Sequence, residues 1–96
     1  MITVIVNFPA PKGATVESMR DAFKTTAPLY EGLPGLVRKQ YLFDPENGIG
    51  GGAYLWKSRE QAEGFYDDAW RKRIEAKYGS QPVINFFESP VIVDNS

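Results

Sequence analysis

The segment ITVIVNF, residues 2–8, constrains the fold of this chain more than any other stretch. Its apolar side chains occupy both sets of alternating positions, so a β-strand here would be apolar on both faces. Strands of this kind lie in the middle of a sheet and are covered from two sides. Each of the two faces of this sheet therefore needs a layer that covers it.

Two helices and three further strands are predicted downstream. The first helix begins at Thr15, a predicted N-cap, and Pro28 should kink or restart it near its end. The second begins after Ser58, bends within residues 64–68 and ends at Gly79. The further strands are predicted over residues 36–43, 51–57 and 82–93, with the turn-rich DPENGIG (44–50) as a hairpin-type connection between the first two.

This β-α-β-β-α-β order is the ferredoxin-like α+β pattern: a four-stranded antiparallel sheet with two helices on one face. Residues 1–96 are enough for a single domain. The helices leave the second face of the sheet uncovered, and whichever alternating set of side chains points there is partly apolar. We expect a second copy to cover it, sheet against sheet, in a homodimer with the form of a dimeric α+β barrel.

The chain contains no histidine and no cysteine. This excludes a Ser–His–Asp triad, an imidazole base, a thiolate nucleophile, zinc ribbons and histidine-ligated haem. The acidic residues are not spaced as a metal site, and we expect no cofactor. The net charge of −1 does not predict nucleic-acid binding, and no apolar run is long enough to predict a membrane span. Met1 leads directly into the first strand without a signal-peptide pattern, so a cytoplasmic location is expected.

A run of glycines precedes bulky aromatic residues in the predicted third strand. GIGGGA (48–53) satisfies G-x-G-x-x-A, but we reject a dinucleotide loop because a strand, not a helix, follows it. In a strand, Gly52, Tyr54 and Trp56 share one face, and the missing side chain would leave a pocket floor beside the rings. A β-bulge beside ordinary core aromatics is the alternative interpretation.

The chain resembles the dimeric α+β barrel superfamily, and within it the mono-oxygenases of the YdhR-like group. The resemblance covers essentially the whole chain and lies in GGAYLW (51–56), the W-x-S-R-E-x-A junction (56–62), Pro28, LPGL (33–36) and NFFESP (85–90). It implies a homodimer whose sheets face each other, with a small-molecule pocket between sheet and helices in each subunit.

The resemblance also implies a chemistry. Cofactor-free members of the antibiotic-biosynthesis mono-oxygenase type oxidise phenolic polycyclic substrates with O₂ and place a Trp where this chain has Trp56. They use an Asn four residues before that Trp and a Tyr six residues after it, where this chain has Gly52 and Ala62. Haem-degrading relatives rely on a histidine, which this chain lacks.

Several side chains are candidates for the pocket. Tyr41 and Tyr66 could donate hydrogen bonds to an oxyanion, or could be core residues with their hydroxyls at the rim. Asn7 could orient a substrate oxygen or make a structural hydrogen bond. Arg38 could hold an acidic substrate or pair with Glu88, and the pair is the favoured prediction. The predicted pocket set is Asn7, Tyr41, Gly52, Tyr54, Trp56, Tyr66 and Trp70.

The sequence thus predicts a mono-oxygenase without metal or flavin, acting on a small aromatic or enolisable compound near Trp56. No catalytic residue is assigned. A non-catalytic binding dimer and an isomerase or lyase of the same fold remain alternatives. Which set of alternating strand residues faces the helices is left open.

Overall fold

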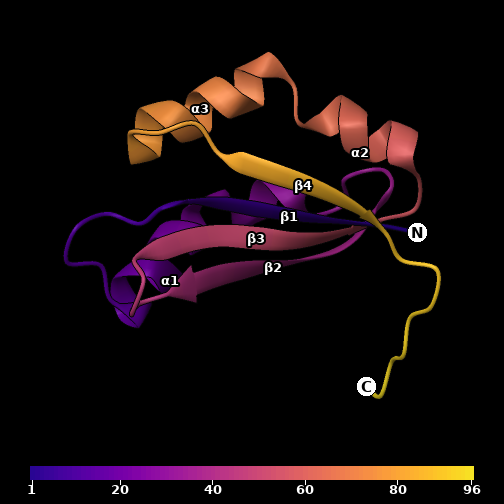
Figure 1. Cartoon of the computed structure of the whole chain (residues 1–96), viewed down its shortest axis with the longest axis horizontal. Helices are drawn as coiled ribbons and strands as arrows, with labels where there is room; N and C mark the ends of the chain where they lie inside the picture. The colour runs from indigo at the N-terminus through magenta and orange to yellow at the C-terminus, as the bar shows by residue number, and fades with distance from the viewer.

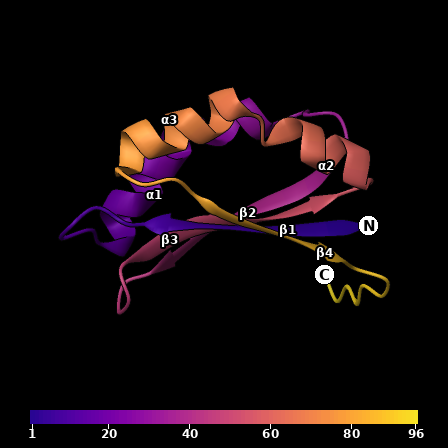
Figure 2. The same cartoon turned by 45° about the horizontal axis from the view of Figure 1, so that its top comes forward.

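A computed structural model describes residues 1–96. The elements along the chain are β1 (Ile2–Pro9), α1 (Val16–Thr26), the 3₁₀ helix η1 (Ala27–Tyr30), β2 (Leu36–Asp44), β3 (Ile49–Trp56), α2 (Arg59–Phe65), α3 (Asp68–Tyr78) and β4 (Val83–Glu88). The strands form one antiparallel sheet in the order β2-β3-β1-β4. The helices lie over one face of that sheet (Figures 1 and 2). The predicted ferredoxin-like α+β fold is confirmed.

The helix boundaries follow the capping and breaking residues of the sequence. The Thr15 side chain accepts a hydrogen bond from the Ser18 N–H, as expected of an N-cap. The predicted change at Pro28 appears as the end of α1 and the start of η1. The predicted bend in the second helix is a full break into α2 and α3, because Asp67 caps α3 by accepting from the Trp70 N–H.

The strand register settles which residues face the helices. Val4 lies opposite Tyr54, and Ile2 lies opposite Trp56 on the same face. Ile2, Val4 and Val6 are almost completely buried there. On β2, a register irregularity between Leu36 and Arg38 is followed by regular pairing, so that Lys39, Tyr41 and Phe43 also face the helices.

The last strand is shorter than predicted. β4 ends at Glu88 rather than at residue 93, because Pro90 lacks the N–H that a continuing ladder needs. The Ser89 N–H still donates to the Met1 carbonyl oxygen at 2.9 Å. The remaining tail runs along the side of the sheet away from the helices (Figure 2), where Ile92 lines a shallow hollow with Thr3 and Leu55.

The sheet face opposite the helices, here called the outer face, carries a mixture of apolar and polar side chains. They are Thr3, Ile5, Asn7, Arg38, Gln40, Leu42, Ala53, Leu55, Val83, Asn85 and Phe87. Phe87 and Val83 are 53% and 59% exposed. A second copy covering this face stays a prediction. None of the helices combines the length and the apolar character needed to cross a membrane.

Candidate functional site

Aromatic side chains pack closely against one another between α2 and the sheet. This packed cluster consists of Trp56, Phe65, Tyr66, Trp70 and Phe86. Trp56 is 1% exposed and Tyr66 is 2% exposed. The Trp56 indole N–H donates to the Tyr66 hydroxyl oxygen at 3.0 Å, so the polar atom of the indole is satisfied within the core.

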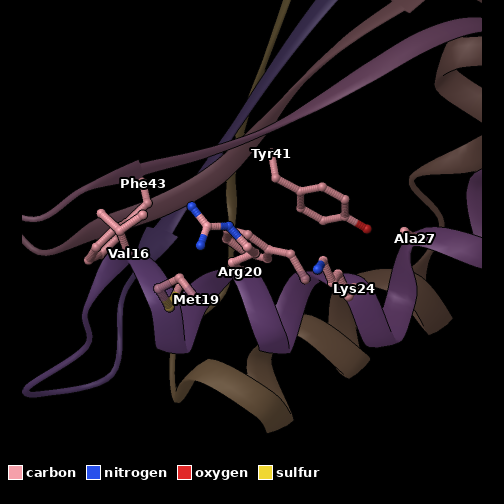
Figure 3. A pocket seen from close by; sticks show the side chains of 8 residues that line it. Val16, Met19, Arg20, Lys24, Ala27, Tyr41 and Phe43 are labelled. Carbon is pink, nitrogen blue, oxygen red and sulfur yellow. The ribbon is translucent and has the colours of Figure 1, made fainter.

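The open space lies at the other side of the same sheet face, between β2 and the α1–η1 segment. A groove of about 400 Å³, the α1 groove, is lined by Val16, Met19, Arg20, Phe23, Lys24, Ala27, Tyr41 and Phe43. Figure 3 shows the Tyr41 and Phe43 side chains reaching from β2 toward α1 around it. Volumes of this size are typical of small-molecule sites.

Two further spaces adjoin the α1 groove. The η1 groove, of about 330 Å³, is lined by Ala27, Tyr30, Glu31, Gly32, Leu36, Val37, Arg38, Lys39 and Tyr41. A small cavity of about 50 Å³ lies deeper, between the sheet, α1, η1 and α3, and includes Phe23, Tyr30, Lys39, Tyr41, Tyr54, Trp70 and Tyr78. Tyr41 lines all three spaces, and the candidate site is therefore centred on it.

The orientation of the Tyr41 hydroxyl is fixed by its partners. The Tyr41 ring stacks on Phe23 with centroids 4.5 Å apart, and its hydroxyl lies 2.7 Å from the Thr26 hydroxyl. The Thr26 hydroxyl also lies 3.1 Å from the Phe23 carbonyl oxygen, to which it can donate. Burial raises the pKa of Tyr41. Tyr41 is therefore a neutral wall residue whose hydroxyl is paired with that of Thr26.

Lys39 is the site residue that the sequence interpretation missed. Its amine lies 3.4 Å from the centroid of the Tyr30 ring and 3.8 Å from that of Tyr41, with the Tyr54 centroid at 4.8 Å. Desolvation by burial lowers the pKa of Lys39 to about 7. The sequence contained a signal for this placement. Lys39 is two residues before Tyr41 and four before Phe43, so in a strand its side chain lies on the same face as these two aromatic rings.

The glycines of β3 make room for these neighbours. A Cβ atom at Gly52 would lie 3.2 Å from Lys39 Cε and 3.0 Å from the Tyr54 ring, so the predicted hollow beside Tyr54 exists but Lys39 occupies it. A Cβ at Gly51 would overlap the Val6 carbonyl oxygen on the neighbouring strand. The absence of side chains thus serves close packing rather than an empty pocket floor.

The predicted pocket residues divide into three groups. Tyr41, Tyr54 and Trp70 line the small cavity, and Gly52 lies beneath the Lys39 side chain. Trp56 and Tyr66 line none of the three spaces and are almost fully buried in the packed cluster, whereas Trp70 belongs to that cluster and also borders the small cavity. Asn7 lies on the outer face, since it alternates with the buried Val6 and Phe8, so it cannot contact a ligand between sheet and helices.

One predicted ion pair is wrong. Arg38 lies on β2 and Glu88 on β4, which are the opposite edges of the sheet. The only salt bridge in the chain joins Arg59 and Glu63 within α2, at 3.4 Å and with both side chains exposed. No group of three or more acidic side chains is arranged to hold a metal ion.

A family model described as "Putative mono-oxygenase ydhR" matches residues 3–88, which includes every strand of the sheet. The chain belongs to the YdhR family. The resemblance found in the sequence is thereby confirmed, and the match extends over both the packed cluster and the grooves. No curated protein sequence matches the chain.

Solved structures with the fold of this YdhR-family chain include proteins of known and unknown activity. A protein of unknown function from Nitrosomonas europaea, NE2512, superposes with a TM-score of 0.74 at 15% identity, covering 99% of this chain and 94% of the other. A mono-oxygenase from the gene ActVA-Orf6 of Streptomyces coelicolor, in complex with the ligand nanaomycin D, gives 0.67 at 12% identity, covering 99% and 92%. SnoaB, a cofactor-independent oxygenase from Streptomyces nogalater, gives 0.64 at 14% identity, covering 96% and 95%. At these identities the likeness shows the shared fold.

Proposed function

We propose that this YdhR-family protein is a mono-oxygenase that oxidises a small aromatic or enolisable compound with O₂, without a metal or flavin of its own. The reaction would take place in the grooves between β2 and the α1–η1 segment rather than beside Trp56. The observation that carries the proposal is the α1 groove of about 400 Å³, mostly apolar, within a chain of this family. The cofactor-independent oxygenase among the similar folds is consistent with it.

The reaction class needs no external reductant. A ring methylene next to an enolisable carbonyl can become a carbonyl while O₂ is consumed. One oxygen atom enters the new carbonyl, and the other leaves as water with the two methylene hydrogens, so the substrate supplies all the electrons. The protein has to remove a proton, hold the resulting anion and exclude bulk water.

The residues of the α1 groove are suited to excluding bulk water. Phe23, Phe43 and Met19 supply apolar walls, and the Met19 side chain is 2% exposed. Tyr41 lines the groove with its ring, which is held by the Phe23 stack and by the hydrogen bond with Thr26. A flat aromatic compound could lie against these rings in the offset or edge-on geometry that aromatic pairs prefer.

We also propose that the protein acts as a homodimer joined through its outer face. The exposed Phe87 and Val83 on β4, together with Ile5 and Leu55, would be covered by the equivalent face of a second copy. Burying such a face also stabilises a domain of this size. Light scattering at micromolar concentration should give twice the chain mass of 10.8 kDa, and a monomer mass would contradict the proposal.

The oxygenase proposal is tested by oxygen uptake with anthrone-type compounds, whose ring methylene can be oxidised to a carbonyl. We expect one O₂ consumed per substrate and one ¹⁸O atom from ¹⁸O₂ in the product, unchanged after dialysis against a chelator. The variant Ala27→Phe fills the two grooves, which share Ala27, and should abolish uptake. Ala76→Phe, on the exposed side of α3, is the matched control and should keep it.

The alternatives give different results in the same experiment. Saturable binding of the compounds without oxygen uptake would identify a binding protein. Product formation that is equally fast without O₂ would identify an isomerase or lyase. Loss of activity on chelation, restored by a metal ion, would contradict the cofactor-free part of the proposal.

A further inference from the structure

Lys39 is a partly buried amine that has no carboxylate partner. It lies on β2 opposite Tyr54 of β3, with its side chain on the helix-facing side of the sheet. The only salt bridge of the chain lies elsewhere, in α2. The immediate neighbours of the amine are instead the aromatic faces of Tyr30 and Tyr41, at 3.4 and 3.8 Å from the ring centroids.

This surrounding has two opposing effects on the protonation of the amine. Burial disfavours the ammonium form and lowers the pKa of Lys39 to about 7. The negative faces of the rings attract a cation and act in the opposite direction. The amine is therefore balanced between its two forms near neutral pH, and its protonated form has no anion to neutralise it. Amines with these properties serve as general bases in enzymes.

A ligand can reach the amine. Lys39 lines the η1 groove of about 330 Å³, which shares Ala27 and Tyr41 with the α1 groove. It also lines the small cavity of about 50 Å³, which has room only for a few water molecules. A flat compound in the grooves could thus place a polar atom beside the amine, where Tyr30 and Tyr41 already define the approach.

We propose that Lys39 is the proton acceptor and counter-ion of this site, and that the grooves take phenols and enols and hold them as their anions. The O–H bond of the ligand breaks, its electron pair stays on the oxygen, and a third N–H bond forms at Lys39 Nζ. Nothing is oxidised or reduced in this step. The resulting ammonium and oxyanion form the ion pair that the free protein lacks.

The other titratable groups around Lys39 do not replace it. Burial raises the pKa of Tyr41 and Tyr54, which face the amine from β2 and β3, and of Tyr78, which lines the small cavity from α3, so these hydroxyls stay neutral near pH 7. The Tyr30 ring faces the amine from η1. The remaining charged groups that line the two spaces are Glu31, Arg38 and Lys77.

Binding of a coloured phenol tests the assignment directly. The probe is 4-nitrophenol, which absorbs visible light only as the phenolate, added to the protein at pH values where the free probe is mostly neutral. With the wild-type protein we expect the phenolate band to grow on binding. The apparent pKa of the probe should fall, and its proton affinity should be at least about tenfold lower. In Lys39→Met the probe should bind without this band.

Two further variants make the test specific. Lys72→Met removes an exposed lysine of α3 and should behave as the wild type. Gly52→Ala keeps the amine but places a Cβ 3.2 Å from Lys39 Cε, which should displace the side chain and weaken the phenolate band. Circular dichroism confirms folding of each variant. A bound probe that stays neutral, equal ionisation in Lys39→Met, or no binding at millimolar probe would overturn the assignment.

The assignment depends on the proposed oxygenase function only for the reaction that follows proton removal. If the wild type ionises the probe but no compound supports oxygen uptake, the oxygenase function fails and Lys39 remains an anion-forming site. If oxygen uptake occurs and Lys39→Met retains the wild-type rate and pH profile, the role of Lys39 fails while the oxygenase function stands.

Discussion

The packed cluster under α2 and the grooves beside α1 lie on the same face of the same sheet and are lined by the same kinds of side chain. In the packed cluster, Trp56 and Tyr66 interlock and hydrogen-bond to each other, and both are almost fully buried. Beside α1, Tyr41 borders three spaces and Lys39 is left without an anionic partner. Both regions are rich in aromatic side chains, so aromatic content does not explain the site. Open space forms where the helices cover the sheet incompletely.

The difference in cover follows from the helices. α2 and α3 bury Ala62, Tyr66 and Trp70 against the middle of the sheet, where β1 and β3 lie. α1 has one buried residue, Met19, and lies along the edge strand β2. An edge strand has a neighbour on one side only, so a helix beside it encloses less space than a helix over the centre. The grooves are located at this less enclosed edge.

Truncating the central ring on each side should separate the two regions most clearly. Trp56→Ala is expected to lower the free energy of unfolding by about 3–5 kcal/mol, because it leaves a cavity within tightly packed rings. Tyr41→Ala should cost about 1–2 kcal/mol, since that ring already borders open space. Urea unfolding followed by circular dichroism measures both. Equal losses in the two variants would mean that the α1 side is packed as tightly as the α2 side.

Removing single hydroxyls sharpens the same comparison. Tyr66→Phe leaves the buried Trp56 N–H without an acceptor and should cost about 1–3 kcal/mol. Tyr41→Phe removes a hydrogen bond to Thr26 at a partly exposed position, where water can replace it, and should cost less than about 1 kcal/mol. Both variants keep their rings, so a reversed order would contradict the assignment of the buried bond.

The α1 side should also give rise to a pH dependence of stability. The pKa of Lys39 falls from 10.5 to about 7 on folding, so the unfolded chain binds more protons at this amine between those values. The free energy of unfolding should therefore rise with pH, by about 1–2 kcal/mol between pH 7 and 9. This window lies below the range in which tyrosines ionise in the unfolded chain.

Lys39→Met should remove this rise, and Lys72→Met should retain it. Urea unfolding at several pH values measures the effect. A flat profile in the wild type would mean that the attraction of the tyrosine rings for the ammonium cancels the cost of its burial.

The sequence was a good guide to the fold because its signals are local. Thr15 caps the start of α1 and Gly79 caps the end of α3, and both signals depend only on the backbone conformation of a few adjacent residues. Pro28 marks the change from α1 to η1. The apolar residues on both faces of residues 2–8 predicted a central strand covered from two sides. β1 lies in the interior of the sheet and its helix-facing side is buried, while the cover of its other side stays a prediction. The extent of β4 was overestimated, because apolar residues continue beyond Pro90 although the ladder does not.

The sequence was a weaker guide to the site. It named Tyr41, Tyr54 and Trp70, which line the cavities, but also Trp56 and Tyr66, which are core, and Asn7, which faces outward. It passed over Lys39, since a lysine in a strand is usually exposed. Whether a strand aromatic packs or lines a cavity depends on the helix above it, and that helix is far away in the sequence.

By itself, then, the sequence determined the order of the elements, their caps and the family of the chain, because these depend on backbone preferences and on which residues are apolar. Only the tertiary structure decided which strand face meets the helices, where their cover is incomplete, and that a lysine fills the space above Gly52. Those outcomes depend on the register between strands and on the packing of helices against them, which arise from contacts between residues distant in the chain.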